Sequence, residues 1–196
     1  VLSHAVIGAD ETRWRMMSEK GKDEGPGNWH VWAVACPTAV SYTILDNRGA
    51  AAAQKVFGGF AGTAMVDGYD VYESLRRTSP GLHLAHCWAH VRRKYVESEG
   101  SFPDQTREVL ALIGKLYDIE RDCPTGPPGD EERARIRDVA SREVVREIQA
   151  WALRTEALPQ SALGRAIAYM GNHWKGLLRF LEDPRVPLDN NATERA

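Results

Sequence analysis

Two aspartates follow apolar stretches of the kind that forms buried strands. Asp10 closes a β-compatible stretch over residues 4–10, and Asp67 follows a shorter one over residues 63–66. If these strands are neighbours, the carboxylates converge, because ligands of open α/β sheets gather at the carboxyl ends of strands. Such a pair favours hard divalent cations, and two ions ~3.5–4 Å apart can assist an in-line phosphoryl displacement. The competing interpretation is that each aspartate is an ordinary turn residue.

A third acid on a helix packed against the sheet would complete such a site, and Glu194 is the candidate. The sequence Asn191-Ala192-Thr193-Glu194 also resembles a capping box, in which a glutamate at the third helical position reaches back to the cap residue's backbone N–H. Spacing alone favours the cap, so both interpretations stay open at this point.

A group of histidines and a cysteine stands in the middle of the chain. His86 and His90 are four apart, and Cys87 and His90 have a spacing seen in metal sites, so a zinc site is one interpretation. The sequence lacks the second ligand pair that would make this signal strong. The alternative is a polar network or a surface that faces DNA.

The basic run Arg92-Arg93-Lys94 follows directly. Arginine and lysine side chains neutralise phosphates and supply much of the affinity of DNA-binding proteins. A solvated helix face explains the same run equally well.

The first half of the chain predicts the sheet that would carry the two aspartates. Runs rich in β-branched and aromatic residues at 4–16, 29–35 and 40–45 predict an antiparallel meander, with a polar, glycine-rich loop over residues 18–28. A helix over 50–57, a strand over 63–66, a helix over 69–75 and a strand over 82–85 should follow. This order predicts a mixed α/β sheet.

From about Cys87 onward the pattern becomes helical. Apolar residues recur at helical spacing over residues 103–122, 136–151 and 161–181, and Ser161 is a suitable N-cap for the last tract. Prolines separate the tracts and close the block. A new helix should begin within residues 188–196.

Composition narrows the class of protein. Of 196 residues, 43% are hydrophobic and 27% charged, as in ordinary globular proteins, and the net charge of −2 gives no general basic excess for nucleic acid. Three widely spaced cysteines fit a reducing compartment, and no apolar run suits a membrane span or a signal peptide. A cytoplasmic protein is expected. The start at Val1 suggests a fragment of a longer protein.

Five groups of residues, taken in order, resemble the IS66 transposase family. They are Asp10-Glu11-Thr12, Val66-Asp67-Gly68-Tyr69 with Tyr72, the run from His86 to Tyr95, the tract 161–181, and the run from Asp189 to Arg195. The likeness extends over almost the whole chain.

This resemblance implies a ribonuclease-H-like fold with a DDE site for DNA strand cleavage and transfer. Asp10 matches the first aspartate, Asp67 the second and Glu194 the glutamate, together expected to hold two Mg²⁺ or Mn²⁺ ions. Further residues are expected to support these ligands or to contact DNA. They are Cys87, His90, Arg92, Arg93, Lys94, Asn190, Asn191 and Arg195.

The long separation of Asp67 from Glu194 implies an all-helical insertion before the last catalytic helix. We therefore expect a core over residues 1–87, an insertion over 88–183, and the start of the final core helix over 184–196. The implied partners are transposon ends and target DNA in a bacterial cytoplasm, further copies of the chain in a synaptic complex, and accessory proteins encoded by the element. No membrane partner is expected.

Two other functions remain open from the sequence. A ribonuclease-H-like nuclease would hydrolyse DNA without joining it. A degenerate or truncated remnant would keep the fold without activity, since the chain ends two residues after Glu194.

Overall fold

The computed structural model describes residues 1–14 and 29–195. The predicted loop over 18–28 and the end of the first predicted strand lie outside these residues. The chain forms two compact units, which we call the sheet unit (Val1–Leu84 with Asn190–Ala196) and the helical unit (Ala85–Asp189). No helix in the described part of the chain is long and apolar enough to cross a membrane.

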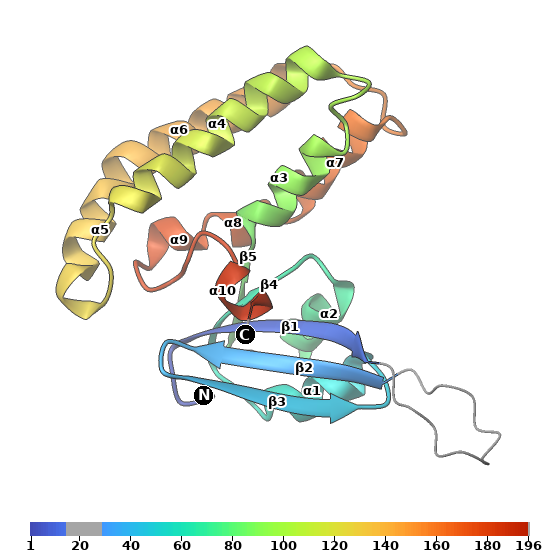
Figure 1. Ribbon diagram of the computed structural model, residues 1–196, viewed down its shortest axis with the longest axis vertical. Coiled ribbons are helices and arrows are strands. Elements are labelled where there is room, and N and C mark those ends of the chain that lie inside the picture. The colour runs from blue at the N-terminus through green and yellow to red at the C-terminus, as the bar shows by residue number, and fades with distance from the viewer. Residues whose placement is uncertain (15–28, 196) are drawn as a thin grey trace. The chain divides into compact units, whose positions relative to one another are not determined.

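The sheet unit is built on five strands in the order β3-β2-β1-β4-β5 (Figure 1). The strands are β1 (Val6–Trp14), β2 (Trp29–Cys36), β3 (Ala39–Leu45), β4 (Gly62–Val66) and β5 (Leu82–His86). β1 pairs antiparallel with β2 and parallel with β4, and β2 pairs antiparallel with β3. The predicted meander and mixed sheet are confirmed.

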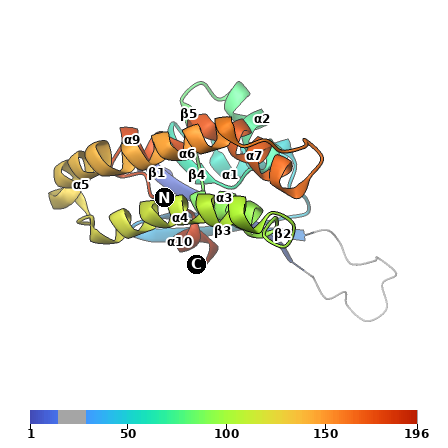
Figure 2. The ribbon, with the colours of Figure 1, turned by 90° about the horizontal axis from the view of Figure 1, so that it is seen from above.

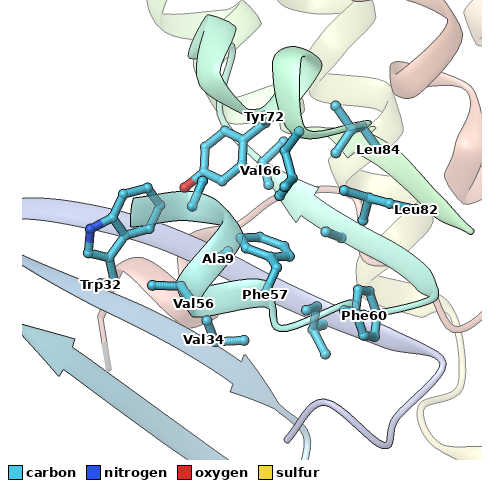
Figure 3. Close-up of a cluster of buried hydrophobic side chains, with 14 of the residues drawn as sticks. Ala9, Trp32, Val34, Val56, Phe57, Phe60, Val66, Tyr72, Leu82 and Leu84 are labelled. Atoms are coloured by element: carbon cyan, nitrogen blue, oxygen red, sulfur yellow. The ribbon is translucent and has the colours of Figure 1, made fainter. Parts of the chain in front are cut away.

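Helices α1 (Ala50–Phe57) and α2 (Asp70–Thr78) share a hydrophobic core with one face of this sheet. Alternation along the strands turns Ile7 and Ala9 of β1 toward this core, while Gly8 and Asp10 point to the opposite face. Figure 3 shows how the helices meet the sheet through large side chains. Those with 5% exposure or less include Trp32, Phe57, Phe60, Val66, Tyr72, Leu82 and Leu84.

The helical unit contains no strand of its own beyond the end of β5. Its α-helices are α3 (Trp88–Val96), α4 (Pro103–Asp122), α5 (Asp130–Ile136), α6 (Arg142–Arg154), α7 (Ala162–Asn172), α8 (Trp174–Leu177) and α9 (Arg179–Glu182). α4 lies beside α6, and α3 lies beside α7 (Figures 1 and 2). The predicted helix over 103–122 is confirmed, and the Ser161 side chain caps α7 by accepting a hydrogen bond from Gly164 N at 3.0 Å.

The predicted helical tract over 136–151 is interrupted by a π-helical turn, η2 (Arg137–Ser141). This turn contains Arg137, which is fully buried. Its guanidinium donates two hydrogen bonds, of 2.7 and 3.0 Å, to the Glu120 carboxylate of α4. The same guanidinium donates to the carbonyl oxygens of Phe180 and Pro184 at 2.8 and 3.2 Å. Arg137 therefore ties three separate parts of the helical unit together.

Candidate active site

The pairing of β1 with β4 brings the two predicted aspartates together. The parallel register aligns Ile7 with Ala64 and Gly8 with Met65. Continued by two residues at the same offset, it sets Asp10 beside Asp67, on the sheet face opposite the hydrophobic core. Both are half-buried. Asp67 directly follows β4, but the prediction that Asp10 ends its strand is wrong, because β1 continues to Trp14 and Asp10 pairs with Ala33 of β2.

Helix α10 (Asn191–Glu194) packs against β1 and β2 on the same face as Asp10. The approach is so close that a Cβ atom on Gly8 would overlap the Thr193 hydroxyl oxygen. The side-chain amide of Asn190, 2% exposed, donates to the Ala9 carbonyl oxygen at 2.9 Å. Because Ala9 precedes Asp10, this bond fixes α10 directly beside the first aspartate.

The capping-box interpretation of Glu194 is wrong. The helix begins one residue earlier than that motif requires, since Asn190 is the N-cap residue and Glu194 N bonds to Asn190 O at 3.1 Å. The Asn190 amide is used instead to hold the helix on β1. Glu194 is exposed, on a helix packed against the strand of Asp10, while Asn191 is half-buried and Arg195 exposed.

Sequence reasoning did not single out Glu11 as a member of this site. Glu11 follows Asp10 on β1, and the buried Tyr72 hydroxyl of α2 donates to its Oε2 atom at 2.6 Å. The pKa of Glu11 is raised to about 7, chiefly by burial and in smaller part by repulsion from Asp67 and Asp10, against the opposing effects of this hydrogen bond and of Arg48. The middle of β1 therefore carries two adjacent carboxylates, which alternation turns to opposite faces of the sheet, and a third follows the end of β4.

The turn after β4 brings two more groups close to these carboxylates. The Asp67 carboxylate accepts a hydrogen bond from Tyr69 N at 2.9 Å, which shapes the entry into α2. The Arg48 guanidinium lies over the Tyr69 ring, 4.7 Å from its centroid, and its charge acts on Glu11. Gly8, a glycine inside a strand, is a sequence signal for this site that was missed, since such a glycine marks the close approach of another segment.

The remaining predicted residues belong to the helical unit. Cys87, 2% exposed, is the N-cap residue of α3, and His90 lies one turn further along. Arg92 and Arg93 are exposed, whereas the Lys94 ammonium pairs with the Glu97 carboxylate at 3.2 Å. Roles for these residues near metal or DNA stay predictions.

His86 packs against another histidine within this unit. Its ring is buried, and its centroid lies 4.5 Å from that of the His173 ring. Burial, followed by the charge of His173, lowers the pKa of His86 to about 3. The imidazole is therefore neutral near pH 7.

Comparison with curated proteins finds relatives in Sinorhizobium fredii (strain NBRC 101917 / NGR234). The uncharacterized protein y4jD is 35% identical over 175 residues, which cover 84% of this chain and 34% of that protein. The uncharacterized protein y4qI is 32% identical over 207 residues, covering 96% of this chain and 38% of that protein. The chain thus spans between a third and two fifths of the length of these relatives. No solved structure matches it.

The model of the transposase IS66 family matches residues 1–196, the whole chain. The match includes both aspartates and the helix that carries Glu194. The chain therefore belongs to the transposase IS66 family.

Proposed function

We propose that the chain is the catalytic core of a DDE transposase with a ribonuclease-H-like sheet unit. Asp10, Asp67 and Glu194 would hold two divalent cations, Mg²⁺ or Mn²⁺. The observation that supports this proposal is the parallel register of β1 with β4, which pairs Gly8 with Met65 and, extended by two residues, aligns Asp10 of β1 with Asp67 just after β4. Membership of the family supports DNA as the substrate.

The residues present fit such cations. The donors are carboxylate oxygens, which hard cations prefer, and they come from two paired strands and a helix packed on the same sheet face. Several carboxylates close together repel one another, and a divalent cation offsets that repulsion. The raised pKa of Glu11, which arises from burial and then from Asp67 and Asp10, is a sign of this repulsion.

In the proposed reaction the protein supplies ligands and alignment. Bound cations of this kind activate the attacking oxygen and stabilise both attacking and leaving oxygens of an in-line displacement. Asp10 and Asp67 offer their oxygens from the sheet, and the Asn190 amide keeps the helix of Glu194 on β1. Water would be the nucleophile for cleavage, and the freed 3′-hydroxyl for joining to target DNA.

We propose that the helical unit is an insertion into the core and that Arg92 and Arg93 of α3 contact DNA phosphates. The two residues are consecutive in the sequence, and both side chains are exposed. Transposon ends, target DNA, further copies of the chain in a synaptic complex and accessory proteins of the element are the proposed partners.

The test is a strand-transfer assay with Mg²⁺ or Mn²⁺ and a labelled, pre-cut duplex bearing the end sequence of the element that encodes the chain. Asp67→Asn should reduce joined product by at least about 10³-fold, since it removes a carboxylate ligand that acts on the transition state. Asp70→Asn is the matched control, because Asp70 is an exposed aspartate three residues away, in the first turn of α2.

Each outcome decides between the three functions considered. Joined product that disappears in Asp67→Asn and persists in Asp70→Asn supports the transposase. Hydrolysed DNA without joined product would instead support a nuclease. Absence of both products in a folded protein that also fails to bind Mn²⁺ would favour a remnant without activity.

A further inference from the structure

A pocket of about 260 Å³ lies between α3 and α7 in the helical unit. The two helices run side by side (Figures 1 and 2), and the Tyr95 hydroxyl of α3 donates to the Met170 sulfur of α7 at 3.6 Å. Away from this contact, α7 contributes two alanines to the pocket, Ala162 and Ala166, which lie one turn apart. Their methyl groups are too short to fill the groove between the helices, so the pocket stays open.

The other side chains that line the pocket carry polar groups. They are Lys94 and Glu97 of α3 and Arg165 and Tyr169 of α7. Positions 162, 165, 166 and 169 have the spacing of one helix face, so Arg165 and Tyr169 lie beside the two alanines. Arg165 is exposed, and its bond to the Gln160 carbonyl oxygen uses one of the five N–H groups of a guanidinium.

The arginines near this pocket differ from most arginines of the helical unit. Six others pair with a carboxylate three or four positions away. They are Arg107, Arg121, Arg135, Arg142, Arg146 and Arg179. Within the described part of the chain, Arg165 forms no ion pair with a carboxylate, and neither does Arg93, which lies one turn before Glu97 on α3. Positive charge is therefore left uncompensated around the pocket, in a chain whose net charge is −2.

A phosphate group suits this arrangement. Lysine and arginine side chains form short, strong hydrogen bonds with phosphate oxygens, and Lys94 and Arg165 reach the pocket from different helices. The volume is smaller than the roughly 300–1,000 Å³ of pockets that enclose a whole small molecule, which favours one group of a polymer over a free nucleotide. The Tyr169 ring and the alanine methyl groups offer apolar surface to a sugar next to the phosphate.

We infer that the pocket between α3 and α7 binds a backbone phosphate of DNA: Lys94 and Arg165 donate hydrogen bonds to its oxygens, and Tyr169 contacts the neighbouring deoxyribose. The site adds α7 to the surface proposed to contact DNA and involves none of the proposed metal ligands. The inference rests on the proposed function, since it takes DNA as the substrate.

Glu97 opposes this binding. Its carboxylate pairs with the Lys94 ammonium at 3.2 Å and places a negative charge on the wall of the pocket. Removing that charge strengthens the attraction for a phosphate, whereas removing the charge of Arg165 weakens it. Substitutions of these two residues should therefore change DNA affinity in opposite directions.

The test measures DNA binding by the complete chain in EDTA, so that metal-dependent cleavage does not interfere. A fluorescein-labelled duplex of random sequence is titrated with protein at several salt concentrations, because phosphate contacts carry no sequence information. The Kd is obtained from fluorescence anisotropy, and the Tm of each protein is recorded. The variants are Arg165→Gln and Glu97→Gln. Arg146→Gln is the matched control, because it removes the charge of an exposed arginine of the same unit that pairs with Glu143.

Arg165→Gln should raise the Kd about tenfold and reduce the slope of log Kd against log salt concentration by about one. Glu97→Gln should lower the Kd by about two- to fivefold. Arg146→Gln should change either quantity little. Each variant should keep a Tm close to that of the wild type, since the replaced side chains are exposed.

Equal effects of Arg165→Gln and Arg146→Gln would overturn the inference, because the pocket would then attract DNA no more than any other surface charge. Weaker DNA binding by Glu97→Gln at an unchanged Tm would overturn it as well. In both cases DNA binding by the wild type leaves the proposed function standing. If the wild type binds no DNA even at low salt, the proposed substrate fails together with the inference.

Discussion

Two half-buried glutamates, Glu120 in the helical unit and Glu11 in the sheet unit, have opposite electrostatic surroundings. In the helical unit, burial alone would raise the pKa of Glu120, but hydrogen bonds from Arg137 and Arg133 hold it below the usual value. In the sheet unit, burial raises the pKa of Glu11 to about 7, and neighbouring aspartates act in the same direction. The Glu120 carboxylate is paired with two arginines, whereas the Glu11 carboxylate lies within the influence of two aspartates.

This difference in the charges around the two glutamates indicates which unit places like charges together at a cost in stability. The helical unit uses its buried charges to hold α4, η2 and the segment after α9 together. The sheet unit collects negative charge in the middle of β1 and just after β4, which lowers stability and is typical of sites that bind a ligand. We therefore expect substitutions of charged residues in the two units to have effects of different size and sign.

The largest effect is expected for Glu120→Gln. Removing this charge leaves Arg137 buried without its carboxylate, and breaking one partner of a buried pair costs about 3–5 kcal/mol. Urea unfolding followed by circular dichroism measures the loss. Glu132→Gln is the matched control, because Glu132 pairs with Arg135 on the surface, where solvent screens the interaction, and its loss should change the stability little. Equal losses from Glu120→Gln and Glu11→Gln would remove the contrast between the units.

A second effect is acid sensitivity at His86. The unfolded chain takes up a proton near pH 6.5, whereas the folded protein resists protonation of this buried ring until about pH 3. Stability should therefore fall as the pH drops below 6.5, with His86 contributing up to about 3 kcal/mol of the loss at pH 4. His86→Gln should flatten the pH dependence of the unfolding free energy between pH 7 and 4. The same replacement of His83, whose side chain is exposed, is the control.

The close approach of α10 to β1 makes Gly8→Ala the sharpest test within the sheet unit. The new methyl group would collide with the Thr193 hydroxyl, and overpacking of this kind costs about 1–3 kcal/mol. Since α10 must move, Mn²⁺ should also stabilise the variant less than the wild type in a thermal melt. Gly100→Ala, where nothing lies within 4 Å of the added atom, serves as the control. If Mn²⁺ raises the Tm of Gly8→Ala as much as that of the wild type, α10 does not take part in metal binding.

The smallest effect is expected for Ser161→Ala in the helical unit. The serine accepts a hydrogen bond from Gly164 N at the start of α7, and loss of such a cap costs about 1 kcal/mol. Thermal unfolding should show a modest decrease in Tm, and replacement of the exposed Ser101 by alanine should show none. A decrease as large as that of Glu120→Gln would mean that caps contribute as much to this unit as its buried charges.

Much of the fold could be predicted because its signals are local. The bounds of α4 follow from apolar spacing, and the meander follows from alternation and β-branched residues. The π-helical turn at Arg137 could not be predicted in this way, because it serves contacts with Glu120 and Phe180, which lie far away in the sequence.

The candidate site likewise combines features that local sequence signals predict with features that depend on distant contacts. Asp67 could be selected from its position after a strand. Asp10 could be selected from the apolar run before it, although β1 continues past it to Trp14. Other features of the site depend on contacts between residues far apart in the sequence, which one sequence does not reveal. They are the hydrogen bond of Asn190 to Ala9, the close packing of Thr193 on Gly8, and the hydrogen bond of Tyr72 to Glu11.

The hydrogen bond between Asn190 and Ala9 joins residues 181 positions apart. A ribosome adds about 5–20 residues per second, so Asn190 is synthesised roughly ten to forty seconds after Ala9. During that interval the strands of the sheet unit can pair, but Glu194 does not yet exist. The nascent chain therefore gains its third carboxylate only after the whole helical unit has been made, and synthesis itself delays the assembly of the proposed DNA-cutting centre.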